Sequence, residues 1–478
     1  MNGTRSRHTL ATSLVGALLL SRGAAAQAPP PSDASASAAA SANPAGDDHD
    51  LVFRSRLTAA GFQRAFTPGP GGAIVTTDTL APFHEAVSLA ADRVDSPVGV
   101  DTLDIQFAAY GQVWAGQPEG MPLSTWDIAS AFLTQRMGPV AVSLGRQPIV
   151  GGAARYRRLD GVSLRGKTEF GLYAAAYGGL TVLPRWDQWY GTHTLGDAYE
   201  QWSSAPDSII TPVRSENWMG GMNVGWADER IGSLGVSFHH QAENQSIADE
   251  SMGVGLRLGS WSPVGLVADA IYSLAQRSWS DVRVVADWAL SKSEKRSVGL
   301  GLRGELLHTL PSALLSQASV LSVFSFEQVT EAGGELDVQL PLGLRVGLGA
   351  FGQDYGEGSP GARLRGTVQL LTGEREQTLL RLVVSRVALE ANAYTQIRLA
   401  GRFPLWSRLT AYTDVYQYFY DQPIKDHDSS TFAAAHLGYA AGKYWSARLG
   451  GSASQSPTAA LDLQAMAQLT LEIDRRDQ

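Results

Sequence analysis

Hydrophobic and polar residues alternate strictly over the last long segment of the chain, 461–473. The apolar positions are Leu461, Leu463, Ala465, Ala467, Leu469, Leu471 and Ile473. The intervening positions are Asp462, Gln464, Met466, Gln468, Thr470 and Glu472. A period of two is typical of a β-strand with one apolar and one wet face. About a dozen residues is also the length that a tilted strand needs to cross a bilayer.

Similar segments recur from residue 51 onwards, about 22 in all. They are 51–62, 82–94, 101–115, 123–136, 139–147, 160–178, 216–227, 229–242, 250–260, 263–275, 280–291, 296–309, 317–329, 333–341, 343–353, 361–372, 377–391, 393–402, 407–420, 430–440, 443–453 and 458–473. Most are joined by short turn-like links, which indicates antiparallel neighbours. The pattern predicts an all-β fold: a transmembrane antiparallel up-and-down β-barrel of about 18–22 strands.

The placement of charges favours a membrane barrel over a water-soluble β-sandwich. An Arg or Lys on the lipid face at mid-bilayer costs about 2–4 kcal/mol, so charged positions should point into the lumen. In 361–370, Leu364 and Val368 alternate with Arg363 and Arg365. The same reasoning predicts that Arg303 and Arg345 also line the pore.

The amino-terminal residues predict export. Residues 1–26 have a basic start, an apolar run from Leu10 to Leu20 and small residues before Gln27, which together predict a signal peptide. Residues 27–50 are rich in Pro, Ser and Ala, and we expect a disordered periplasmic tail. The barrel is then expected at 51–473, in the outer membrane of a Gram-negative-type bacterium.

Composition excludes several classes of protein. The chain has no cysteine, so it has no disulfide, thiolate metal site or lipid-bearing cysteine. Its net charge is -8 and it has no block of Lys or Arg, so no nucleic-acid partner is expected. No catalytic motif is present, and His239 and His240 should point to opposite faces of one strand. We therefore expect no enzyme activity, no cofactor and no metal site.

One stretch of this acidic chain is strongly basic. Its charged residues are Arg146, Arg155, Arg157, Arg158, Arg165 and Lys167, with Asp160 and Glu169 as the acids among them. If 139–147 and 160–172 pair as a hairpin, these side chains converge on one wall of the lumen. We predict that they contact an anionic solute, and the alternative is a ladder of ion pairs between neighbouring strands.

The same stretch resembles a known family. Leu144-Gly145-Arg146-Gln147, followed by Arg155, Arg158 and Asp160-Gly161-Val162, is similar to the Gly-Arg-Gln … Asp-Gly-Val hairpin of alginate-export-type and related porin-like barrels. The resemblance covers about 25 residues. It implies a single outer-membrane barrel whose arginine-rich lumen passes an anionic polysaccharide, with Arg146, Arg155, Arg158 and Arg165 as lumen contacts.

Two functional hypotheses follow. The first is a porin-like channel for polar or anionic solutes, including oligosaccharide or polysaccharide export with periplasmic export proteins as partners. The second is a structural or envelope-machinery barrel that acts through protein partners and is plugged by 179–215. That segment lacks a period of two and contains Trp186, Trp189 and Trp202, which argues against plain disorder.

Barrel closure gives a final prediction. If the strand at 461–473 pairs with the strand at 51–62, Asp462 and Glu472 should lie across from the inward Arg54 and Arg56.

Overall fold

The computed structural model describes residues 50–66, 75–76, 81–95, 102–115, 124–182, 217–243, 246–259, 262–291, 298–310, 328–356, 360–372, 378–389, 392–424, 426–457 and 459–474. Their strands are β1 Asp50–Phe66, β2 Val75–Thr76, β3 Ala81–Asp95, β4 Thr102–Ala115, β5 Ser124–Met137, β6 Val140–Val150, β7 Tyr156–Lys167, β8 Leu172–Thr181, β9 Trp218–Asp228, β10 Gly232–Glu243, β11 Ser246–Leu258, β12 Val264–Ser273, β13 Ser278–Ser291, β14 Gly299–Thr309, β15 Val329–Gln339, β16 Leu344–Asp354, β17 Pro360–Thr372, β18 Thr378–Leu389, β19 Tyr394–Trp406, β20 Leu409–Ile424, β21 His427–Ala440, β22 Trp445–Gln455 and β23 Ala459–Asp474. Two short 3-10 turns accompany them, η2 Gly152–Ala154 and η5 Pro341–Gly343. None of the helical segments in these ranges has the length and apolar character of a membrane span.

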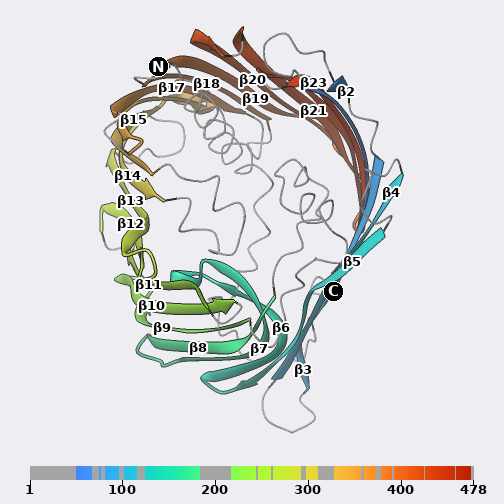
Figure 1. The fold of residues 1–478 in the computed structure, drawn as a ribbon, viewed down its shortest axis with the longest axis vertical. Coiled ribbons are helices and arrows are strands. Elements are labelled where there is room, and N and C mark those ends of the chain that lie inside the picture. Colours follow the sequence, from blue (N-terminus) through green and yellow to red (C-terminus); the bar gives the residue numbers. More distant parts are fainter. Residues whose placement is uncertain are drawn as a thin grey trace, which may run out of the picture.

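The strands form one closed antiparallel ring (Figure 1). Each long strand pairs with the next one along the chain, and β1 pairs with both β3 and β23. The two-residue β2 pairs only with the end of β1, so the described ring has 22 strands. The predicted up-and-down barrel is confirmed, because sequential hairpins with no crossover leave no sheet edge open.

One predicted strand is wrong. The segment 160–178 is two strands, β7 and β8, joined by a tight turn over Thr168–Gly171. Glu169 and Phe170 continue the alternation of the strands through this turn, so the period of two could not reveal it. Most of another predicted strand, 317–329, lies outside the described residues, and so do the predicted signal peptide and all but the last residue of the predicted tail.

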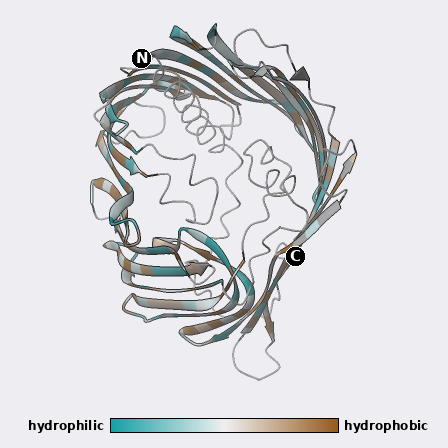
Figure 2. Ribbon diagram, viewed as in Figure 1, coloured by the Kyte–Doolittle hydropathy of each residue, from teal (hydrophilic) through white to brown (hydrophobic). Residues whose placement is uncertain are grey.

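The outer surface of the barrel is apolar. Along β18, Leu380, Leu382 and Val384 are exposed, whereas the alternate Arg381 and Ser385 point inward. The same alternation of apolar and polar residues runs along the other ribbons (Figure 2). Exposed leucine and valine side chains on a closed ring find an apolar environment only in lipid. The barrel is therefore a transmembrane protein of outer-membrane type.

Aromatic residues mark the two ends of the apolar band. Trp218 and Trp279 lie at one end, and Trp288, Trp406 and Trp445 lie at the other, all exposed on the outer surface. Tryptophan prefers the level of the lipid headgroups, so these residues form two girdles. The girdle of Trp288, Trp406 and Trp445 lies at the end where β1 begins and β23 ends. The links between strands are shortest at this end, for example Gly138–Pro139. Short turns mark the periplasmic end of such barrels.

The predicted seam between the first and last long strands is confirmed. Arg54 of β1 lies opposite Glu472 of β23, and its Nη2 donates to Glu472 Oε1 at 2.7 Å. The prediction for Asp462 is wrong, because the register places it opposite Arg64, ten residues further along β1. Asp462 and Glu472 stand near opposite ends of this 16-residue strand, so they cannot share one partner region.

We expect the Arg54–Glu472 pair to contribute little to stability. Its side chains are 32% and 41% exposed, so water screens the charges and the pair should be worth about 0–1 kcal/mol. A double-mutant cycle of Arg54→Ala and Glu472→Ala, measured by unfolding in detergent, tests this. Arg56 faces Thr470 in the same seam, so Arg56→Ala serves as the control and should show no coupling to Glu472→Ala. A coupling well above 1 kcal/mol would contradict the expectation.

Candidate functional site

A hairpin tip enters the lumen. The strap, which we define as residues 147–158, comprises the ends of β6 and β7 and the turn η2. The register of β6 with β5 stops at Arg146, and the register of β7 with β8 begins only at Leu159. Beyond these points the hairpin bends inward, and η2 contacts β10, β11 and β12 across the intervening strands (Figure 1). The strap therefore occupies part of the cross-section of the barrel.

Gly145 lies where the strap leaves the wall. Its φ is +124°, a conformation that side-chain-bearing residues rarely adopt. A Cβ built on Gly145 would lie 2.3 Å from the Ala131 carbonyl oxygen of β5. Only glycine fits this close approach between the two backbones. The bend of the hairpin is thus encoded at one residue of the Leu-Gly-Arg-Gln sequence.

The strap is fixed to the inner wall by its backbone. Ala153 N donates to Ser237 Oγ of β10 at 2.8 Å, and Ser251 Oγ of β11 donates to Ala153 O at 3.3 Å. Ala153 is fully buried. Gly253 provides the space for this contact, because a Cβ there would lie 3.0 Å from Ala153 N and 2.6 Å from Ser237 Oγ.

Two arginines of the strap reach the same wall. Arg155 Nη2 donates to Ser280 Oγ of β13 at 2.6 Å. Arg157 Nη2 donates to Asp249 Oδ2 at 2.9 Å, and its Nε donates to Gln241 Oε1 at 3.2 Å. Asp249 and Gln241 are buried. These guanidinium groups therefore act as anchors that hold the strap against β10–β13.

Arg146 faces away from the lumen. It shares the parity of Leu144, which is exposed on the outer surface. Directly opposite on β7 is Asp160, and Arg146 bonds both of its carboxylate oxygens, at 2.7 and 2.8 Å. Gln147, one residue further, points inward and accepts a hydrogen bond from Ser163 Oγ at 2.6 Å. In this protein the Gly-Arg-Gln … Asp-Gly-Val residues join the two strands below the strap.

The remaining residues of the predicted basic wall are spread along the hairpin. Arg158 is buried. Arg165 is inward on β7 and lies in register with Ala141, which faces Arg136 of β5 on its other side. Lys167 is the last residue of β7. Glu169 lies in the turn that follows. It therefore stands at the periplasmic end of the barrel and belongs to neither strand. The structure thus gathers Arg155, Arg157 and Arg158 in the strap and places Arg146, Arg165 and Lys167 elsewhere along the hairpin.

A larger set of cations lies on another part of the ring. We define the arginine wall as the inward arginines of four consecutive strands, β16–β19. Its members are Arg345, Arg363, Arg365, Arg381, Arg398 and Arg402. The only acidic residue in these strands is Asp354, the last residue of β16, on the outward parity. The wall therefore has no inward carboxylate of its own.

Acids of the flanking strands neutralise part of this wall. Arg398 Nη2 lies 2.7 Å from Asp414 Oδ2 of β20. From β15, Glu331 pairs with Arg363, and Glu335 Oε2 lies 3.7 Å from Arg365 Nη1.

Two arginines of the wall lack such a partner. Arg345 and Arg381 form no ion pair with any described residue, and the register joins them through Gln369 in one row. Arg381 Nε is buried without a hydrogen-bond partner in the described part of the chain. A guanidinium with unused donors next to other cations is a binding position for an anion.

Sequence analysis predicted Arg345, Arg363 and Arg365 as pore-lining but omitted Arg381 and Arg402. In the sequence Thr-Leu-Leu-Arg-Leu-Val-Val, hydrophobic residues stand on both parities around Arg381. The alternation is therefore hard to see in this strand. Arg303 is inward on β14, and its Nε lies 3.9 Å from Asp287 Oδ1 and 3.8 Å from Glu305 Oε2.

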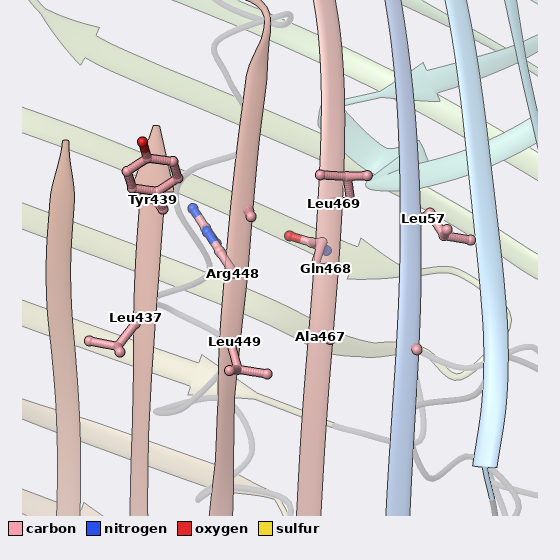
Figure 3. Close-up of a pocket in the computed structure, with 10 residues that line it drawn as sticks. Leu57, Leu437, Tyr439, Arg448, Leu449, Ala467, Gln468 and Leu469 are labelled. Carbon is pink, nitrogen blue, oxygen red and sulfur yellow. The ribbon is translucent and has the colours of Figure 1, made fainter. Parts of the chain in front are cut away.

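A groove of about 380 Å³ lies on the outer surface, away from this chemistry. It crosses β21, β22, β23 and β1 and is lined by Leu57, Leu437, Tyr439, Leu449 and Leu469 (Figure 3). Ala59, Ala447 and Ala467 also line it, as do two residues of the opposite parity, Arg448 and Gln468. Most of these side chains have the lipid-facing parity, so the groove belongs to the membrane surface.

The two adjacent histidines point to opposite faces, as predicted. His239 is buried on the lumen side and its Nδ1 is 2.8 Å from Tyr177 Oη. His240 faces outward, where it is 3.2 Å from Glu250 Oε1. Within the described ranges, no three His, Asp or Glu residues converge in a way that could hold a metal ion.

No protein-family model and no curated protein matches this chain. Its structure is similar to solved outer-membrane pores. The outer membrane protein OpdK of Pseudomonas aeruginosa is 10% identical, with a TM-score of 0.43 over 89% of this chain and 99% of that chain. A BenF-like porin from Pseudomonas fluorescens Pf-5 is 9% identical, with a TM-score of 0.42 over 89% and 99%. The translocation pore of the P pilus usher PapC is 8% identical, with a TM-score of 0.42 over 88% and 99%. Likenesses at this level give no information on the solute.

Proposed function

We propose that this barrel is a porin-like, water-filled channel that passes polar and anionic solutes across the outer membrane. The observation that carries the proposal is the arginine wall: six inward arginines on four consecutive strands that have no inward acid. A wall of one charge sign inside a pore raises the local concentration of the opposite ion and repels like charges.

The chemistry of the wall suits oxyanions. A guanidinium group presents a planar fork of N–H donors that matches a carboxylate, sulfate or phosphate, and it stays charged at every physiological pH. Arg345 and Arg381 form no direct ion pair with a described residue, so an entering anion does not have to displace a bound carboxylate; Glu335 and Asp337 of β15 act on Arg381 only from a greater distance. Export of a polysaccharide along this wall, and periplasmic export proteins as partners, remain narrower predictions.

Planar-bilayer recordings of the full-length protein test the proposal. We expect stepwise currents, and a reversal potential in a salt gradient that shows preference for the anion. Replacing chloride by a large organic anion should reduce the current more than replacing potassium by a large organic cation. The absence of steps, or a preference for the cation, would refute the proposal.

The second candidate is a structural or envelope-machinery barrel that is plugged by 179–215 and acts through protein partners, and the strap already occupies part of the lumen of such a barrel. Residues 179–182 complete β8 and the short stretch after it, and the rest of the predicted plugging segment, 183–215, lies outside the described residues. Deleting 184–205 separates the two candidates. A large rise in conductance supports the closed barrel, and an unchanged conductance supports the open channel.

A further inference from the structure

Tyrosines occupy almost every inward position in the middle of β20. The inward residues from 412 to 420 are Tyr412, Asp414, Tyr416, Tyr418 and Tyr420. Tyr394 of β19 lies in register with Tyr420, and its ring centroid is 6.1 Å from that of Tyr418. We call Tyr394, Tyr412, Tyr416, Tyr418 and Tyr420 the aromatic column. It stands directly beside the arginine wall.

Part of the adjoining surface has only small or polar inward residues. The inward residues that continue the row of Asp414 into the next strands are Ala434, Ser452 and Gln464, which are small or polar. A lumen-facing position in a wide barrel is in contact with water, so a large ring gains little there by burial alone. The column therefore presents flat apolar surface inside a polar lumen, and two inward rings of β21 join it: Phe432 beside Tyr416, and His436, which stacks on Tyr412 with centroids 4.6 Å apart.

The column has a rigid middle and accessible ends. Tyr416 and Tyr418 are buried, and Phe432 of β21 packs edge-on against Tyr416 with centroids 5.6 Å apart. Tyr394, Tyr412 and Tyr420 are only half-buried. The central rings thus support the wall, and the end rings keep exposed surface towards the lumen.

Polar partners accompany the rings row by row. The register pairs Tyr412 with Arg402, Tyr416 with Arg398 and Tyr418 with Gln396. The Arg398 guanidinium lies over the Tyr416 ring, 4.6 Å from its centroid, and holds both oxygens of Asp414. Gln396 Nε2 donates to Tyr418 Oη at 2.7 Å.

This combination matches one class of solute. A pyranose ring has an apolar C–H face and an equator of hydroxyl groups. An aromatic ring offers the complementary apolar face, and guanidinium, amide and carboxylate groups offer in-plane hydrogen bonds to hydroxyls. We propose that the aromatic column is a stacking track for saccharides, neutral ones included. The inference rests on the proposed channel function and names its solute class.

The test measures block of the open channel by a neutral malto-oligosaccharide, with a linear polyethylene glycol of similar mass as the size control. We expect transient closures with the sugar and none with the polymer. Tyr412→Ala and Tyr420→Ala should each weaken sugar binding about tenfold, which corresponds to about 1.4 kcal/mol. Tyr412→Phe and Tyr420→Phe should retain most of the block, because the ring remains.

The matched control is Phe419→Ala. Phe419 lies on the same strand but is exposed on the outer surface, so its loss should leave sugar block unchanged. Channels that conduct but show no sugar block would overturn the inference, and so would block that both alanine variants retain in full. In either case the channel itself stands.

A second measurement covers a protein that does not conduct. Calorimetric titration of the detergent-solubilised full chain with the same sugar measures binding to the aromatic column without requiring conduction. Binding that the alanine variants lose supports the track even if the proposed channel fails, whereas absence of binding overturns it. A uronate oligosaccharide that binds equally to the wild type and to the alanine variants would assign binding to the arginine wall alone and likewise overturn the track.

Discussion

Gly253→Val is expected to release the strap and to raise single-channel conductance above that of the wild type. A Cβ at residue 253 would stand 2.6 Å from Ser237 Oγ and 3.0 Å from Ala153 N, so a branched side chain and η2 cannot share the space. Overpacking of this kind costs about 1–3 kcal/mol. The hairpin can relieve it by leaving the wall, because the strap pairs only with itself and forms no strand pairing with β5 beyond Arg146 or with β8 before Leu159.

The control for this prediction is Gly304→Val. A Cβ on Gly304 meets nothing within 4 Å, and the residue has the outward parity of β14, so conductance should not change. A second variant, Asp249→Ala, leaves Arg157 without its carboxylate. Removing one partner of a buried pair costs about 3–5 kcal/mol, so this variant should also loosen the strap. Wild-type conductance in both variants would show that the strap does not limit ion flow.

Charge reversal at two arginines, Arg345→Glu with Arg381→Glu, is expected to turn the anion preference of the channel into a cation preference. Both residues are inward, stand in one register row and have no ion-pair partner among the described residues. A unit charge at about 4 Å contributes about 4 kcal/mol at an effective dielectric constant of 20. The measurement is the reversal potential in a salt gradient, which should change sign.

Salt dependence provides an internal check on that result. The Debye length is about 10 Å at 0.1 M salt and about 3 Å at 1 M, so the change should be large in dilute salt and small in concentrated salt. Arg386→Glu is the matched control. Arg386 lies on the outward parity of β18, where it pairs with Asp421, so its reversal should leave selectivity unchanged. An equal effect of all three substitutions would show that the wall does not set selectivity.

Much of the barrel could be predicted from alternation alone. Lipid accepts apolar side chains and excludes charges. The alternation of Leu364 with Arg363 therefore indicates which side of the strand faces lipid and which faces the lumen, before any contact is known. The same rule, applied at the two ends of the chain, predicted that Asp462 and Glu472 lie across from Arg54 and Arg56, and of these acids only Glu472 does so. A tight turn that keeps the alternation, as at Thr168–Gly171, defeats the rule, and this is why β7 and β8 were predicted as one strand.

The lumen was less predictable. The basic residues 155–158 suggested an anion-binding wall, but Arg157 is bound to Asp249, 92 residues away. The row that joins Arg345 to Arg381 spans three strands, and only the register of those strands brings the two side chains together.

By itself the sequence determined the class of fold, the face of most strands and the pairing that closes the ring. These follow from local alternation, since the bilayer acts on each strand separately and with the same rule. Only the tertiary structure decided which inward side chains meet. The strap leaves the wall at Gly145 and rests at Gly253, and the aromatic column stands beside the arginine wall. Such contacts depend on shear and register across strands that are far apart in the chain, and alternation within a strand carries no information on either.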